Sequence, residues 1–271
     1  MVQQDTLTKE DMEIFMRKIK ECFQGVYMAL GMFTAIPMPF HFWKEKHTSM
    51  MITVYPIVGL VVGGLWWLAF SLLFVLNMPY MLTAATLTAV PFFVVGFIHL
   101  DGYIDTSDAL LSYRPLEDKL RILKDPNVGA FAVVMLVILF IMQFGAVYTI
   151  AGNRQYLLLI IGIMVLSRCC SAFCIFYLSH NSGSNYAPLL AQGLGWGHKM
   201  FVLLTAMVAM VFSFVYAGVV GMIVLVVVLM GYFLAMLKAY RGFKGVSGDL
   251  LGFALVISEC CGLIALAVMQ R

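Results

Sequence analysis

Long uninterrupted apolar runs alternate with shorter polar stretches along this 271-residue chain. About 20 apolar residues suffice for a helix to cross a bilayer, and the runs lack the short alternating segments of membrane β-strands. We therefore predict an all-α fold, a polytopic membrane bundle of about seven transmembrane helices, within a range of six to eight. The predicted spans cover residues 50–76, 79–98, 129–151, 156–178 and 250–269, together with 200–237, which is long enough to divide into two helices near Gly218–Gly221.

The N-terminal region is more polar and mixed in charge. Residues 9–23 place apolar side chains near one helical face, which predicts an amphipathic helix on the membrane surface. Residues 25–39 are apolar but short and end in two prolines, which suits a half-inserted or re-entrant piece. We therefore divide the chain into an interfacial segment, residues 1–24, and a single integral membrane domain, residues 25–271.

Composition supports the membrane class. The chain is 62% hydrophobic and only 11% charged, whereas a soluble domain carries roughly 25% charged residues. Its mean hydropathy is +0.95. A formal net charge of +3 is too small to indicate binding to nucleic acid. The six cysteines form no C-x-x-C pairs and lie mostly in apolar segments, so we interpret them as packing residues.

Basic residues predict the orientation of the bundle, because they concentrate on the cytoplasmic side of membrane proteins. With the N-terminus inside, the inner connections carry most of the basic residues, and Arg154 is the main exception within the chain. The polar connections at residues 99–128, 179–199 and 238–249 then all emerge on the cytoplasmic side.

Three aspartates stand together after the second predicted span, in HLDGYIDTSDALLS at residues 99–112. On a helix, Asp101, Asp105 and Asp108 fall within an arc of about 60°, so their like charges repel one another. Carboxylate oxygens are ligands for hard cations such as Mg²⁺. The alternative is that these acids solvate a helix end or pair with nearby basic residues. Six of the 14 acidic residues lie between 101 and 125, and this concentration favours a metal site.

Two further aspartates precede later spans on the same predicted side. Asp125 lies in KDPNVGAF (124–131), as either an N-terminal helix cap or another metal ligand. Asp249 lies in GVSGDLLG (245–252), where a cap is again the alternative to a metal ligand. The spacing of Gly248 and Gly252 suits close helix packing.

Arg168 and Glu259 are charged residues inside predicted spans, where such side chains normally face the interior and find partners. Arg168 either contacts a substrate phosphate or pairs with Glu259 or an aspartate. Carboxylates, interspersed basic residues and a cavity at membrane level together favour metal-assisted phosphoryl transfer. The residues themselves do not name the substrate.

HLDGYIDTSDALLS, followed by RILKDPNVGAF at residues 121–131, resembles the paired signature of the cobalamin synthase family, adenosylcobinamide-GDP ribazoletransferase. The usual text of that family is close to H-L-D-G-x-x-D-T-x-D-G-L and then M-K-D-S-R-x-G-x-x-G. The resemblance spans about residues 30–265. Further pieces agree in order: FTAIPMP (33–39), YPIVGLVVGG (55–64), LSR (166–168), GLG (193–195) and SGDLLG (247–252).

The resemblance implies a catalytic membrane domain in the prokaryotic cytoplasmic (inner) membrane, with its active site facing the cytoplasm. The family performs the last joining step of the nucleotide loop of cobamides (vitamin B12) and uses Mg²⁺. It transfers the adenosylcobinamide phosphate of adenosylcobinamide-GDP to α-ribazole or α-ribazole 5′-phosphate, giving adenosylcobalamin or its 5′-phosphate and GMP. The implied partners are these substrates and the lipid bilayer, without nucleic acid; a homo-oligomer stays open.

The resemblance also implies roles for individual residues. Asp105 and His99 are the candidate bases. Pro126 and Asn127 stand where the family usually has Ser-Arg, so other basic residues would hold the phosphates. The candidates for that role are Lys124, Arg121 and Arg168. The metal ligands implied near the diphosphate are Asp101, Asp105, Asp108, Asp125 and Asp249.

Two other functions remain as alternatives. A CDP-alcohol phosphotransferase is also a metal-dependent membrane enzyme, and Asp105 and Asp108 begin its signature, but Ala109 and a missing Ala-Arg pair end the match. A cation or proton transporter would use the acids as its pathway and predicts acids distributed through the bilayer. The acids here gather at one face instead.

Overall fold

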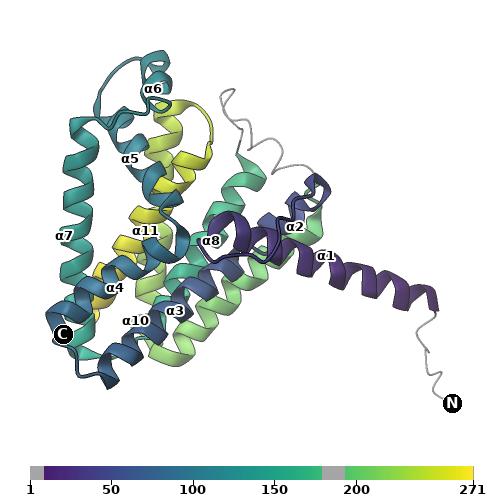
Figure 1. The fold of residues 1–271 in the computed structure, drawn as a ribbon, viewed down its shortest axis with the longest axis horizontal. Helices are drawn as coiled ribbons and strands as arrows, with labels where there is room; N and C mark the ends of the chain where they lie inside the picture. The colour runs from purple at the N-terminus through teal and green to yellow at the C-terminus, as the bar shows by residue number, and fades with distance from the viewer. Residues whose placement is uncertain (1–8, 179–192, 271) are drawn as a thin grey trace.

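The computed structural model describes residues 9–178 and 193–270, and the described residues form helices without a strand (Figure 1). The predicted all-α fold is therefore confirmed. In chain order the helices are α1 (Lys9–Phe33), the short 3-10 helix η1 (Glu45–His47), α2 (Thr48–Thr53), α3 (Tyr55–Val75), α4 (Tyr80–Val95), α5 (Ile98–Leu111), α6 (Leu116–Ile122), α7 (Ala130–Asn153), α8 (Leu159–Tyr177), α10 (Trp196–Phe243) and α11 (Gly248–Met269).

Within the described residues, five helices are long and apolar enough to cross a membrane: α3, α7, α8, α10 and α11. The pair α4 and α5 passes the same test together but is bent by 96°, which makes six if the pair is one span. These helices are compatible with a polytopic membrane bundle, as the apolar runs predict.

Helix α10 is too long for one crossing and is interrupted where the sequence suggests a division. Its 48 residues would extend about 72 Å, more than twice the hydrocarbon thickness. Gly218 departs from helical geometry (φ 57°, ψ −136°), and the arms on either side run in different directions in Figure 1. Just after this turn, Gly221 packs directly on the backbone of Ser213. Among the described residues, counting the two arms separately gives six spans, and seven, as predicted, if the bent pair of α4 and α5 is also one span.

The second predicted span is shorter than expected because the chain turns sharply at its end. Helix α4 has 16 residues, and Gly96 and Phe97 then adopt left-handed backbone angles (φ 72° and 65°) before α5 begins. The Ala35 amide donates to the Val94 carbonyl (2.8 Å), one of the carbonyls that a helix end leaves without an intrahelical partner. The aspartate-bearing stretch, expected in a polar connection, is thus a helix packed into the bundle.

Helix α1 continues across residue 24, where the sequence interpretation separates an interfacial segment from the membrane domain. Its N-terminal half extends away from the bundle in Figure 1, and Met12, Met16 and Phe23 are exposed there. Its C-terminal half is packed, with Met28 and Ala29 buried. The stretch at 25–39 is therefore the end of a long helix followed by an irregular segment.

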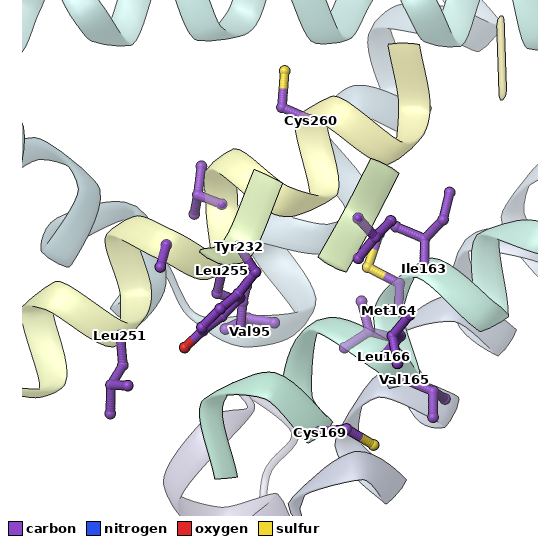
Figure 2. Packing of buried hydrophobic residues seen from close by; sticks show 14 of the residues in the cluster. Val95, Ile163, Met164, Val165, Leu166, Cys169, Tyr232, Leu251, Leu255 and Cys260 are labelled. Atoms are coloured by element: carbon purple, nitrogen blue, oxygen red, sulfur yellow. The ribbon is translucent and has the colours of Figure 1, made fainter. Parts of the chain in front are cut away.

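Helix α11 lies at the centre of the bundle and packs against α5, α7, α8 and α10. Figure 2 shows part of this core, where Val95 of α4, Met164 of α8, Tyr232 of α10 and Leu255 of α11 lie in one apolar cluster. Outer helices instead expose large apolar side chains over much of their surface. An apolar exterior around a packed interior is expected of an integral membrane protein.

Candidate active site

Four aspartates come together where α5 meets the first turn of α11. Asp101, Asp105 and Asp108 lie along α5, and Asp249 lies at the start of α11. The charges of Asp101, Asp249 and Asp108 all act on Asp105, and Asp101 also acts on Asp249. We call these four residues the carboxylate cluster. The structure thus assembles four of the five proposed metal ligands from two helices far apart in the sequence.

Two glycines place Asp249 beside α5. A Cβ on Gly102 would lie 2.6 Å from the carbonyl oxygen of Asp249 and 2.8 Å from its Cα. A Cβ on Gly252 would lie 3.1 Å from the carbonyl oxygen of His99 and 3.2 Å from its Cα. Position 102 is therefore paired with 249, and 99 with 252, so the two helices run antiparallel in backbone contact. Close packing at Gly252 agrees with the sequence, whereas Gly248 faces open space.

The carboxylate cluster has no basic neighbour in the described part of the chain, because no Lys, Arg or His nitrogen lies within 4.0 Å of its carboxylate oxygens. The salt bridges found there are Arg121–Asp118, at 3.8 Å, and Arg168–Glu259. The alternative in which basic residues neutralise the aspartates of α5 is not observed. Mutually repelling carboxylates without a counter-charge are suited to bind cations.

Asp108 also stabilises the start of α7. Its Oδ1 accepts a hydrogen bond from the Ala132 amide (3.4 Å), and Gly129, the N-cap residue of α7, lies against its carboxylate. A Cβ at position 129 would collide with both oxygens. The positive end of the helix dipole stabilises a carboxylate in this place. Asp108 therefore performs the capping role that the sequence offered for Asp125.

Asp125 lies apart from the carboxylate cluster, in the exposed loop before α7. Its Oδ1 accepts hydrogen bonds from the Asn127 amide (2.9 Å) and the Asn127 Nδ2 (2.8 Å), which hold the pKa of this carboxyl below its ordinary value. Asp125 is not among the charges acting on Asp105. Lys124 and Arg121 are exposed near it. Their assignments, to metal for Asp125 and to phosphate for the two basic residues, stay predictions.

Arg168 is buried in the interior and pairs with Glu259. Its Nη1 donates to Glu259 Oε1, to Ser167 Oγ (2.9 Å) and to the Met164 carbonyl (3.1 Å), while Ser167 Oγ donates to Glu259 Oε1 (2.9 Å). Arg168 is only 1% exposed. The sequence left open whether Arg168 contacts a substrate phosphate or forms an ion pair, and the structure shows the ion pair with Glu259. In this arrangement the guanidinium is not open to a substrate phosphate.

His99 and Asp105, the two candidate bases, face different surroundings. They are six residues apart, so they lie about 120° from each other around α5. The Nε2 of His99 is hydrogen-bonded to the Tyr55 hydroxyl (2.8 Å), and its ring lies near Phe33 (6.4 Å between centroids). Asp105 lies among the other carboxylates. Sequence reasoning missed Tyr55, although it stands in the quoted YPIVGLVVGG stretch.

The carboxylate cluster does not form a closed metal cage. Among the described residues, no three His, Cys, Asp or Glu side chains converge closely enough to hold a metal ion. Mg²⁺, however, is usually bound by one or two carboxylates together with substrate phosphates and water. The donor set therefore fits Mg²⁺ held jointly with a phosphate ligand. Asp101 and Asp249, which lie within electrostatic range of each other, are the two residues that would contact it.

Fold and site together define a class, a polytopic membrane protein with a cluster of aspartates where two of its helices meet. The sequence profile of the family described as cobalamin-5-phosphate synthase matches residues 25–267 of this chain. The chain belongs to this family, which confirms the resemblance carried by its aspartate-rich signature.

Several relatives named adenosylcobinamide-GDP ribazoletransferase are similar over nearly the whole chain. The protein of Clostridium botulinum strain Alaska E43 is 36% identical over 248 residues, which cover 91% of this chain and 98% of the relative. That of Clostridium perfringens strain ATCC 13124 is 34% identical over 251 residues, 93% and 100% of the two chains. That of Desulfitobacterium hafniense strain Y51 is 32% identical over 256 residues, 88% and 94%. No solved structure matches the chain. The prediction of an enzyme of the transferase class is thereby confirmed.

Proposed function

We propose that this protein catalyses the Mg²⁺-dependent transfer of adenosylcobinamide phosphate from adenosylcobinamide-GDP to α-ribazole or its 5′-phosphate, with release of GMP. The observation that carries this proposal is the carboxylate cluster, which lies in the family's signature and has no basic neighbour within 4.0 Å among the described residues. A site that binds a diphosphate through metal ions needs such an excess of negative oxygen ligands.

The reaction exchanges the phosphoanhydride bond of a diphosphate for a new phosphodiester bond. A hydroxyl oxygen of the acceptor forms the new bond to the phosphorus attached to cobinamide, the bond from that phosphorus to GMP breaks, and the hydroxyl proton passes to a base. When bound, Mg²⁺ would neutralise the diphosphate and stabilise the departing GMP. Asp101 and Asp249 would hold it. Asp105 is the better placed of the two candidate bases, because His99 Nε2 is already engaged by Tyr55.

Basic residues support a cytoplasmic active site. Helix α6 and the turn between α10 and α11 lie at one end of the bundle in Figure 1, together with the start of α11, and the C-terminus lies at the other. The basic residues of this first end include Lys119, Arg121, Arg241 and Lys244. At the opposite end Arg154 follows α7. Because basic residues favour the cytoplasmic side, we place the carboxylate cluster facing the cytoplasm of a prokaryote and the bundle in its inner membrane.

The test is release of GMP by the purified protein in nanodiscs, with adenosylcobinamide-GDP and α-ribazole, with and without Mg²⁺. We expect turnover that EDTA abolishes and Mg²⁺ restores. Asp105→Asn should slow this turnover by about 100-fold or more, which is the effect of losing one electrostatic contact in a transition state. Asp118→Asn is the matched control, because Asp118 pairs with Arg121 at the surface, and it should retain activity. A folded wild-type protein that releases no GMP would overturn the proposal.

A further inference from the structure

A cavity of about 590 Å³ lies between the last turns of α1 and the irregular segment that follows this helix. This volume falls within the range of about 300–1,000 Å³ that is typical of small-molecule sites. The carboxylate cluster contributes none of its lining. The residues that define its walls include Tyr27, Met28 and Gly31 of α1, and Met38, Phe40 and Trp43 of the segment.

The walls of this cavity are aromatic and rich in thioethers, and one wall is held in place by hydrogen bonds. The Tyr27 hydroxyl donates to the Phe40 carbonyl (2.5 Å) and accepts from the Phe40 amide (3.1 Å). The rings of Tyr27 and Phe40 stack at 4.8 Å with an interplanar angle of 13°. Because the hydroxyl is used internally, Tyr27 offers the cavity mainly its ring. Such surfaces, with polarisable methionine sulfur beside them, favour a flat aromatic ligand.

Packed residues next to the cavity connect α1 and the segment that follows it to the start of α5. Phe33, the last residue of α1, lies 4.4 Å from the Tyr55 ring, and Tyr55 hydrogen-bonds His99 in the first turn of α5. The Ala35 amide donates to Val94 at the break before α5. The segment that forms one wall is therefore fixed to the beginning of the helix that carries the aspartates.

Polar residues at the edge of the cavity indicate that it opens at the membrane–water interface. His41 is exposed and contributes to the lining. Lys44 follows directly, with its ammonium 5.3 Å from the centre of the Phe42 ring. Charged side chains are costly at hydrocarbon depth. A water-borne aromatic ligand is therefore favoured here over a lipid acyl chain.

We infer that this cavity binds the flat heteroaromatic base of the acceptor nucleoside, the benzimidazole ring system of α-ribazole. The identity of the ligand rests on the proposed function, whereas the cavity and its aromatic walls do not. The base would stack on the aromatic side chains of Tyr27 and Trp43, beside the methionines of the lining.

Two glycine substitutions test the inference as a matched pair. A Cβ on Gly31 would lie 3.4 Å from Met38 Cγ, so Gly31→Leu fills the cavity, whereas Gly64 of α3 faces open space and Gly64→Leu serves as the control. Both changes add the same side chain to a helix. We expect Gly31→Leu to raise KM for α-ribazole about tenfold, as loss of uniform binding does, with kcat and KM for adenosylcobinamide-GDP unchanged within about twofold. Gly64→Leu should change none of them.

Direct binding separates this inference from the proposed function. Trp43 provides a fluorescence signal in nanodiscs, with Trp43→Phe identifying its contribution, and we expect α-ribazole to quench it in the wild type but not in Gly31→Leu. Met38→Ala, which enlarges the cavity instead of filling it, should weaken binding in the same direction. Quenching without any transferase activity would support the cavity assignment and refute the proposed function.

Three results would overturn the assignment. One is an active enzyme whose KM for α-ribazole is the same in Gly31→Leu and wild type. Another is a rise in KM for adenosylcobinamide-GDP alone, which would assign the cavity to the other substrate. The third is quenching of Trp43 fluorescence by brominated lipid, without relief when α-ribazole is added. That result would assign the cavity to a lipid acyl chain.

Discussion

The buried acid Glu259 and the four aspartates of the carboxylate cluster have opposite surroundings. Glu259 is 7% exposed, and both Arg168 and Ser167 donate hydrogen bonds to it. The carboxylate cluster holds four aspartates within electrostatic range and, in the part of the chain that the structure describes, no basic neighbour within 4.0 Å. A buried charge without a partner is strongly destabilising, so a purely structural acid in a membrane protein is expected to be paired. The difference separates Glu259, which is paired inside the fold, from the carboxylate cluster, and it supports the proposal that the cluster binds a cation.

The largest effect is expected from breaking the interior ion pair. Arg168→Met leaves Glu259 buried and uncompensated, which should lower the free energy of unfolding by about 3–5 kcal/mol. The double change Arg168→Met with Glu259→Leu should recover most of that loss, as measured by denaturant or thermal unfolding in the same detergent. A double variant that is stable but inactive would show that Arg168 acts on substrate. The ion pair would then belong to the active site, and its contrast with the carboxylate cluster would not hold.

Removing one charge from the carboxylate cluster should affect activity rather than stability. Asp101→Asn removes one of the repelling charges, so the unfolding temperature should stay the same or rise slightly, since such repulsion amounts to a few tenths of a kcal/mol. The rate of GMP release should nevertheless fall by about 100-fold or more. Both quantities can be measured on one preparation. A variant that loses stability and activity in parallel would show that Asp101, like Glu259, has a structural role.

A smaller effect is expected from moving Asp249 without changing its charge. Gly102→Ala places a Cβ 2.6 Å from the Asp249 carbonyl oxygen, so α5 and α11 must separate. Displacements of about 1 Å can cost up to about 100-fold in rate, and we expect roughly tenfold here. Gly248→Ala is the control, because among the described residues an added Cβ there would meet no other part of the chain within 4 Å. Equal activity of the two variants would show that the close contact does not position the site.

The smallest effect is expected at Asp125. Asp125→Asn should change the rate of GMP release by less than about twofold, because the side chain is exposed and bonded to Asn127 rather than to the cluster. Its lowered pKa means that the native side chain stays ionised throughout the neutral range, so no pH dependence should arise from it. A large loss of activity or of Mg²⁺ affinity would show that the loop closes onto the metal.

Local sequence patterns predicted much of the site. Three aspartates spaced on one helical face had to point the same way once α5 formed, because side-chain direction follows helical periodicity. The same periodicity separates His99 from Asp105 around α5. Gly252 was correctly associated with close packing. The capping role, however, was assigned to Asp125 as one option, and it belongs to Asp108, which reaches α7 from another helix.

The sequence by itself determined that this is an all-α membrane protein of the cobalamin-5-phosphate synthase family, because run length and a contiguous signature are local properties. Only the tertiary structure decided three further points. Asp249 lies beside the aspartates of α5, Asp125 lies apart from the carboxylate cluster, and Glu259 pairs with Arg168. These outcomes depend on which helices touch and how closely. For Asp249, backbone contact at Gly102 and Gly252 sets the outcome across about 150 residues of chain, a separation over which helical periodicity carries no information.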